Sequence, residues 1–225
     1  MKSVDGSAKG PAARARRRAL EVLARLEQAH ADAHCALHHA DPWQLLVATM
    51  LSAQCTDERV NQVTPLLFAR CPDAAATAAA DLGELEELIR STGFFRAKAR
   101  NIQAAARMLL EDHGGEVPRA LDALVRLPGV GRKTAHVVRG VAFGEAAMVV
   151  DTHVKRLALR LGWTRAQDPR QIEEDLCRLL PRAKWTQAGH VLIFHGRRIC
   201  KAPTPHCSRC PVSSSCPRVG VAKSR

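Results

Sequence analysis

The spacing of apolar residues constrains the fold of this 225-residue chain more than any other feature, because it follows the period of an α-helix. Helical spacing recurs at Leu20, Leu23 and Leu26, at Val47, Met50 and Leu51, and at Ile102, Ala105, Ala106 and Leu109. Alternating strand patterns are absent, and glycines and prolines divide the sequence into segments of roughly 7 to 19 residues. The sequence therefore predicts an all-α fold.

The charge balance indicates a polyanionic partner. Lys and Arg number 34 against 22 Asp and Glu, which gives a net charge of +12. Nucleic acid is the first expectation for such a chain, with a ribosomal or chaperone-like basic surface as the alternative. Aromatic residues make up only 4% and there is no Tyr, which disfavours proteins that stack successive bases on a sheet.

The sequence gives no sign of export or membrane insertion. It has no apolar run long enough to span a bilayer, and its first residues lack the apolar stretch of a secretory signal. Four of the eight cysteines are scattered singly, as is typical of buried thiols in a reducing compartment. We therefore expect a cytoplasmic protein associated with the bacterial nucleoid, without a membrane partner.

The segment richest in candidate functional residues is 127–135, with the sequence Leu-Pro-Gly-Val-Gly-Arg-Lys-Thr-Ala. Residues 120–126 before the glycines and 132–143 after them are predicted helices. The segment is not a nucleotide-hydrolase phosphate loop, because Arg132 separates Gly from Lys. It is not a dinucleotide fingerprint either, since Thr134 stands where the third glycine is needed.

What remains is a helix–hairpin–helix. Gly129 and Gly131 allow a tight turn and let a ligand approach the backbone. The N-terminus of the second helix then offers unpaired N–H groups to a phosphate. The alternative is a simple αα-hairpin within a bundle.

Two cations stand at the start of the second helix, where the helix dipole is unfavourable for them. Arg132 and Lys133 each cost up to about 1 kcal/mol there. For Lys133 this placement is useful, because a lysine amine attacks a sugar carbon only when it is neutral. The helix N-terminus, Arg132 and partial desolvation all favour the neutral amine. Lys133 is thus either a nucleophile or one more phosphate contact.

A carboxylate follows the hairpin at Asp151, after the apolar run 146–150. It precedes a predicted helix carrying Val154, Leu157 and Leu161. Aspartate is a favoured helix N-cap, which is the structural interpretation. A carboxylate fixed in this way also stabilises an oxocarbenium-like sugar and relays a proton from an amine, so the two roles are compatible.

The hairpin segment, followed by Val150-Asp151-Thr152-His153, resembles the endonuclease III family of base-excision DNA glycosylases. Leu51-Ser-Ala-Gln54-Cys-Thr-Asp57 is similar to a second segment of that family, and the resemblance runs from residue 35 to residue 216. It implies a bifunctional enzyme acting on damaged double-stranded DNA. Lys133 would displace an oxidised pyrimidine as a Schiff-base nucleophile, β-elimination would nick the strand 3′ to the abasic site, and Asp151 would be the partner carboxylate.

The resemblance also implies which residues distort DNA. An enzyme that extrudes a base must fill the space it leaves, and Gln54 matches the hole-filling glutamine of the family. Phe94 stands at a wedge position where the family more often has an aliphatic residue. His136 replaces a usual asparagine on the same helix face as Lys133. Three cations after the wedge are expected to contact phosphates: Arg96, Lys98 and Arg100. The full DNA-binding set is Gln54, Phe94, Gly129, Val130, Gly131, Arg132, His153 and Lys201.

Four cysteines crowd near the C-terminus in the pattern Cys200-x6-Cys207-x2-Cys210-x5-Cys216. Disulfides are disfavoured in a reducing compartment, so a metal centre is expected. Four thiolates suit either structural zinc or a four-iron cluster. The family resemblance implies a [4Fe–4S] cluster. Either metal centre would stabilise a segment too small to build its own core.

Two alternative functions stay open from sequence. An adenine-mismatch or other monofunctional glycosylase of the same superfamily usually lacks a lysine at position 133 and carries an extra C-terminal domain, whereas this sequence ends at residue 225. A non-catalytic DNA-binding protein using the hairpin as a clamp would need neither Lys133 and Asp151 together nor Gln54.

We expect a monomer of two helical domains, with DNA and the active site in the cleft between them. Residues 35–145 would form a six-helix barrel with the hairpin at 120–143. Residues 14–34 and 146–225 would form a discontinuous iron–sulfur cluster domain, preceded by a mobile basic tail at 1–13.

Overall fold

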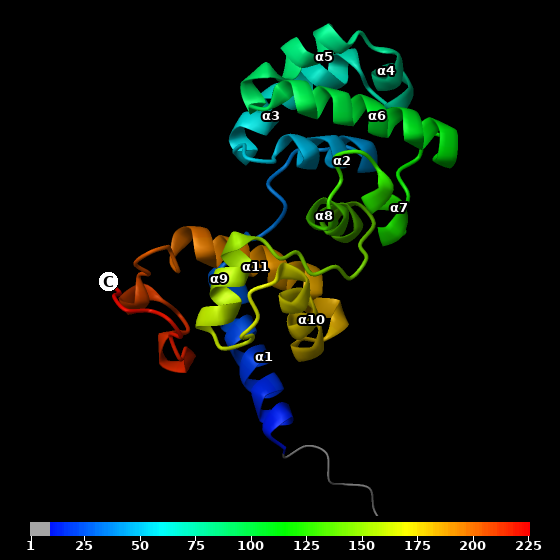
Figure 1. The fold of residues 1–225 in the computed structure, drawn as a ribbon. Helices are drawn as coiled ribbons and strands as arrows, with labels where there is room; N and C mark the ends of the chain where they lie inside the picture. The colour runs from blue at the N-terminus through cyan, green and yellow to red at the C-terminus, as the bar shows by residue number, and fades with distance from the viewer. Residues whose placement is uncertain (1–9) are drawn as a thin grey trace, which may run out of the picture. The chain divides into compact units, whose positions relative to one another are not determined.

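The computed structural model of the chain describes residues 10–225, which form α-helices, short 3-10 helices and no strand (Figure 1). The predicted all-α fold is confirmed. The chain divides into two compact units, one from the N-terminal residues up to His34 together with Ala146–Arg225, the other from Cys35–Glu145. No helix in residues 10–225 is both long and apolar enough to cross a membrane.

The first helix, α1 (Pro11–Ala29), begins earlier than expected. The sequence places residues up to 13 in a mobile tail, with the helix opening at Arg14, and this boundary is wrong. Pro11 occupies the first turn, where its fixed φ suits a helix and its missing N–H costs nothing. Residues 1–9 of the expected tail lie outside the described residues.

The unit Cys35–Glu145 holds seven α-helices, one more than expected, and all of its residues are described. They are α2 (Pro42–Leu51), α3 (Asp57–Arg70), α4 (Ala74–Ala79), α5 (Leu82–Ile89), α6 (Phe95–His113), α7 (Leu121–Arg126) and α8 (Arg132–Ala142), with the 3-10 helix η1 (Arg90–Thr92) after α5. Asp73 and Asp81 each cap a separate short helix, α4 and α5. Asp73 accepts from the Ala76 N–H at 2.7 Å, and Asp81 accepts from the Glu84 N–H at 2.9 Å.

Helix α2 lies at the centre of this unit. Its residues from Trp43 to Leu51 are buried except Gln44, because it packs against α3, α6 and α8. A helix that is apolar on all sides is a core element, unlike the amphipathic α6, which covers α4 and α5 with one face. The loop after α2 begins at the buried residue Leu51, and the turn before α6 begins at the buried residue Thr92.

The other unit joins α1 to the C-terminal part of the chain. Its further elements are α9 (Thr152–Arg160), α10 (Pro169–Leu179), η2 (Arg182–Lys184), α11 (Trp185–Arg198), η3 (Cys207–Arg209) and η4 (Ser213–Ser215). The buried face of α1, including Leu23 and Leu26, packs on α10 and α11 (Figure 1). An ion pair joins the segment just after α1 to the end of α11, where Arg198 donates to both carboxylate oxygens of Asp32 at 2.8 and 2.7 Å.

Substitution of a buried leucine of α2 should show how much this helix contributes to the free energy of unfolding. Leu46→Ala removes a side chain with 0% exposure, and we expect it to lower the free energy of unfolding by about 2 to 5 kcal/mol. Leu66→Ala, on α3 of the same unit, removes a leucine that is 68% exposed and should change stability by no more than about 0.5 kcal/mol. Denaturant unfolding of both variants tests this, and equal losses would contradict it.

Candidate functional site

The predicted helix–hairpin–helix is confirmed, since α7 and α8 flank the glycine turn. The turn is closed by the Val130 N–H, which donates to the Leu127 carbonyl at 3.0 Å. Gly129 has a φ of +76°, and a Cβ placed there would lie 2.8 Å from Cβ of Asn101 on α6. Gly129 is therefore required both by backbone conformation and by close packing.

Gly131 is a glycine for a different reason. Its φ of −85° suits any residue, and a Cβ built on it would meet no atom within 4 Å. It is the N-cap of α8, and no side chain caps that helix end. The missing side chain leaves the first N–H groups of α8 open to an approaching anion.

Val130 does not contribute as the sequence suggests. It belongs to the predicted DNA-binding set, but its side chain is 6% exposed and packs in the core of its unit. Its N–H is already bonded to Leu127. Val130 thus anchors the hairpin rather than offering a contact.

Lys133 is the second residue of α8 and lies exposed next to the exposed Arg132. The expected partial desolvation of this amine is not supplied by the chain itself. His136, one turn further along α8, is buried with 6% exposure. His136 is three residues from Lys133 on α8, but its side chain points toward the core of the unit.

Asp151 is the N-cap of α9, as its structural interpretation predicts. Its carboxylate accepts a hydrogen bond from the Val154 N–H at 2.8 Å, which fixes the side chain at the positive end of the helix. Asp151 is half-buried. It belongs to the unit that contains α1, whereas Lys133 belongs to the other unit.

His153 is half-buried against α11. A Cβ at Gly196 would lie 2.9 Å from the Cβ of His153, so the two helices touch at this glycine. Burial lowers the pKa of His153, and Arg156 lowers it further, while Asp151 raises it. The guanidinium of Arg156 lies 3.1 Å from Nδ1, and a hydrogen bond to the Gly196 backbone also raises the pKa of His153.

Two exposed residues of the unit Cys35–Glu145 have left-handed backbones. Gln54, in the loop after α2, has a φ of 54°, and Phe94, just before α6, has a φ of 51°. Such conformations cost about 1 to 3 kcal/mol in a residue other than glycine and often mark functional positions. Phe94 is 67% exposed, so it is not the core residue that an aromatic pair would ordinarily supply. Its neighbour Phe95 is half-buried, with the Arg96 guanidinium 4.9 Å from its ring centre.

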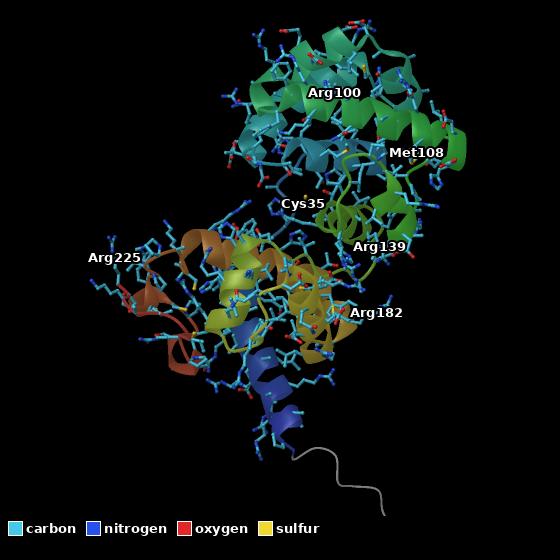
Figure 2. All side chains as sticks on the ribbon, in the orientation of Figure 1. Cys35, Arg100, Met108, Arg139, Arg182 and Arg225 are labelled. Carbon is cyan, nitrogen blue, oxygen red and sulfur yellow. The ribbon has the colours of Figure 1, made fainter. Side chains whose placement is uncertain are left out.

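Lys98 is not a phosphate contact, and that prediction is wrong. The side chain is 7% exposed, and its Nζ donates to the Leu51 carbonyl at 2.7 Å and to the Thr92 carbonyl at 2.9 Å. The two other cations of the predicted set do reach solvent. Arg96 lies 3.6 Å from Glu86, and Arg100 is exposed on α6 (Figure 2).

The four C-terminal cysteines, Cys200, Cys207, Cys210 and Cys216, line one cavity and are all half-buried. Leu157, Val212 and Ile199 supply part of its apolar wall. Within residues 10–225, no three side chains of the His, Cys, Asp and Glu types converge closely enough to hold a single metal ion. Lys201, of the predicted DNA-binding set, is exposed directly after the first cysteine.

Hydrogen-bond donors lie against two of these sulfurs. Arg160 Nη1 donates to Cys200 Sγ at 3.3 Å and also to the Cys200 carbonyl. His195 Nε2 lies 3.5 Å from Cys210 Sγ, and its Nδ1 lies 2.9 Å from Nε2 of His30. Burial raises the pKa of the Cys210 and Cys216 thiols, so they need a compensating positive charge in order to ionise.

Arg160, His195 and His30 were missed by the sequence analysis. For Arg160 a signal existed, because Arg156 and Arg160 stand four apart on one face of a short amphipathic helix. Both reach toward the cysteine segment, Arg156 donating to the Cys200 carbonyl at 3.1 Å. No spacing rule links His30 to His195, which lies far along the chain on α11.

Comparisons with known proteins agree on one family. Residues 47–182 match the family model described as "HhH-GPD superfamily base excision DNA repair protein". The chain is 54% identical over 203 residues to endonuclease III of Synechocystis sp., covering 90% of this chain and 93% of that protein. It is 50% identical over 185 residues to endonuclease III of Bacillus subtilis, covering 82% and 84%.

Solved structures give the same result. A trapped endonuclease III–DNA covalent intermediate is 46% identical with a TM-score of 0.86, covering 90% of this chain and 96% of that one. A non-covalent endonuclease III–DNA complex is 45% identical with a TM-score of 0.85, covering 90% and 95%.

The two hairpin glycines should respond differently to alanine. Gly129→Ala forces a left-handed alanine against Asn101 and should lower the free energy of unfolding by about 1 to 3 kcal/mol. Gly131→Ala meets open space, so its melting temperature should match that of the unsubstituted protein. It should nevertheless weaken duplex DNA binding, because the added methyl stands before the N-terminus of α8. Unchanged binding by a stable Gly131→Ala variant would contradict a phosphate contact there.

Proposed function

This chain belongs to the endonuclease III family of the HhH-GPD superfamily of base excision DNA repair proteins, and we propose that it removes oxidised pyrimidines from duplex DNA through Lys133. It is a DNA N-glycosylase and abasic-site lyase, and its partner is damaged double-stranded DNA. We propose that it acts as a monomer in the cytoplasm, at the bacterial nucleoid. The observation that carries the residue assignment is the exposed position of Lys133 in the first turn of α8, directly after the hairpin.

The chemistry assigned to Lys133 starts from the neutral amine. Its Nζ attacks C1′ of the deoxyribose, and the bond between C1′ and the damaged base breaks with its electron pair leaving on the base. Loss of protons from nitrogen and opening of the sugar give the Schiff base. Removal of a C2′ proton then expels the 3′ phosphate, and water hydrolyses the remaining Schiff base to free Lys133.

The surroundings of Lys133 favour this role over a simple phosphate contact. Its side chain is exposed in the first turn of α8, directly after the hairpin turn, where a nucleophile can reach the sugar of a bound duplex. In this assignment Asp151, fixed as an N-cap, stabilises the positive charge that develops on the sugar and relays the amine proton.

The remaining residues hold and distort the duplex. The uncapped N-terminus of α8 binds a phosphate, and Gly131 allows its close approach. Exposed Gln54 fills the space of the extruded base and exposed Phe94 wedges between bases. His153 and Lys201 contribute further contacts to the DNA backbone.

We also propose that Cys200, Cys207, Cys210 and Cys216 hold a [4Fe–4S] cluster. Four half-buried thiols around one cavity fit a four-iron cluster with four thiolate ligands. Donors from Arg160 and His195 suit thiolate sulfurs. When bound, such a cluster supplies four metal–thiolate bonds that tie the C-terminal segment to α9 and α11.

The two alternative functions fit less well. A monofunctional adenine-mismatch glycosylase has no use for an exposed lysine in the first turn of α8. A non-catalytic clamp would not require exposed Gln54 and Phe94 in costly left-handed conformations.

Covalent trapping tests the assignment of Lys133. We expect borohydride to cross-link the protein to a duplex containing thymine glycol or an abasic site, because reduction fixes the Schiff base. Lys133→Gln should abolish the cross-link while retaining the melting temperature, since the side chain is exposed. Lys223→Gln, which removes another exposed lysine, should trap as the unsubstituted protein does. Undiminished trapping by Lys133→Gln would overturn the assignment.

Substitution of one cysteine tests the cluster. We expect the purified protein to be brown, to absorb visible light and to contain iron, and Cys207→Ser should lose all three properties along with thermal stability. Cys177→Ser, which alters a half-buried cysteine of α10 outside the cavity, should keep them. Stoichiometric zinc without visible absorption in the unsubstituted protein would refute an iron–sulfur cluster.

A further inference from the structure

A buried lysine joins the ends of two secondary-structure elements in the unit Cys35–Glu145. Lys98 lies in the first turn of α6, and its Nζ is 2.7 Å from the Leu51 carbonyl and 2.9 Å from the Thr92 carbonyl. Leu51 is the last residue of α2, and Thr92 is the last residue of η1. One ammonium group thus bonds to two chain segments that are remote in sequence.

Each of these carbonyls lies two or three residues before a residue with a left-handed backbone. Gln54 follows Leu51 in the loop after α2, and Phe94 follows Thr92 in the turn before α6. The backbone N–H of Lys98 also donates to the Phe94 carbonyl at 3.1 Å. Lys98 therefore bonds to the turn on both sides of Gly93 and to the start of the Gln54 loop.

The chemistry of this contact is unlike that of a packed core. A lysine with 7% exposure loses most of its hydration, and this burial lowers the pKa of Lys98, while Cys55 raises it. The carbonyl at the end of α2 carries the negative end of a helix dipole, which offsets part of the desolvation cost. An apolar side chain such as methionine would fill the same volume without that cost, so the ammonium has a task that packing alone does not require.

We propose that Lys98 is a positioning residue that fixes the separation between the Gln54 loop and the Phe94 turn, so that both side chains enter the DNA at the same lesion. The proposal rests on the function proposed above, in which Gln54 fills the space of the extruded base and Phe94 wedges beside it. Both residues must be held before binding, because ordering two loops during base extrusion would add to its free energy. Lys98 supplies this order through hydrogen bonds to the rigid ends of α2 and η1.

The same helix provides a matched control. Gln103 of α6 is also 7% exposed, and its Nε2 donates to the Ala80 carbonyl at 2.8 Å, a contact that reaches neither loop. Lys98→Met and Gln103→Met each remove one buried side-chain donor from α6. They should lower the melting temperature of the unit, but only the first should free the two loops.

The experiment compares single-turnover excision of thymine glycol in two duplexes. In one the lesion pairs with adenine and must be extruded, and in the other it faces an abasic-site analogue and extrusion costs little. For Lys98→Met we expect a loss of roughly tenfold or more on the paired lesion and a much smaller loss on the unpaired one. Gln103→Met should lower the excision rate on both duplexes by the same factor, which is set by the folded fraction of the variant. Equal losses on both duplexes for Lys98→Met would overturn the proposal.

A second variant keeps the test valid if Lys98→Met does not fold. Glutamine at this position keeps one donor but is too short to reach both carbonyls, so Lys98→Gln should also lower the ratio of paired to unpaired excision rates. A ratio equal to that of the unsubstituted protein would contradict the proposal. If the unsubstituted protein itself fails to excise thymine glycol or to form a borohydride cross-link, the proposed function fails instead, so the two failures are distinguishable.

Discussion

The contact between Gly129 and Asn101 is the constraint on which the site depends. Because no side chain stands at Gly129, the hairpin turn packs against α6 and α2, with Met50 also at 3.0 Å from a Cβ placed there. The turn sets where α8 begins, and the start of α8 sets where Lys133 stands. The reactive amine is thus placed by the packing of backbone against core, not by contacts of the lysine itself.

The cationic side chains of the protein fall into two groups, exposed and buried, with different roles. Exposed cations such as Arg132 and Arg100 face solvent, where a polyanion can reach them. Buried or half-buried cations, Lys98 and Arg160, instead bond to backbone carbonyls and to a cysteine sulfur, and so hold loops in place. The net charge of +12 therefore overstates the charge that contacts DNA, because some of these groups stabilise the protein's own structure.

The sequence predicts the helices, the hairpin and the cap at Asp151 because these depend on local spacing. It fails where burial decides the role of a residue. Val130 and Lys98 lie among residues of the predicted interface, yet both point into the core. Lys98 stands four residues before Ile102, on the buried face of α6, so extending the apolar period backwards would have indicated its burial. The contact between His30 and His195 has no such signal, because it forms only when α1 packs on α11.

The most direct test of the account is to locate the covalent bond itself. After borohydride reduction of the complex with lesion-containing DNA, proteolysis and mass spectrometry would identify the peptide that carries the sugar remnant. We expect a single modified residue, Lys133, whose amine bonds to deoxyribose C1′. A remnant on another lysine, or on the N-terminal amine, would contradict it.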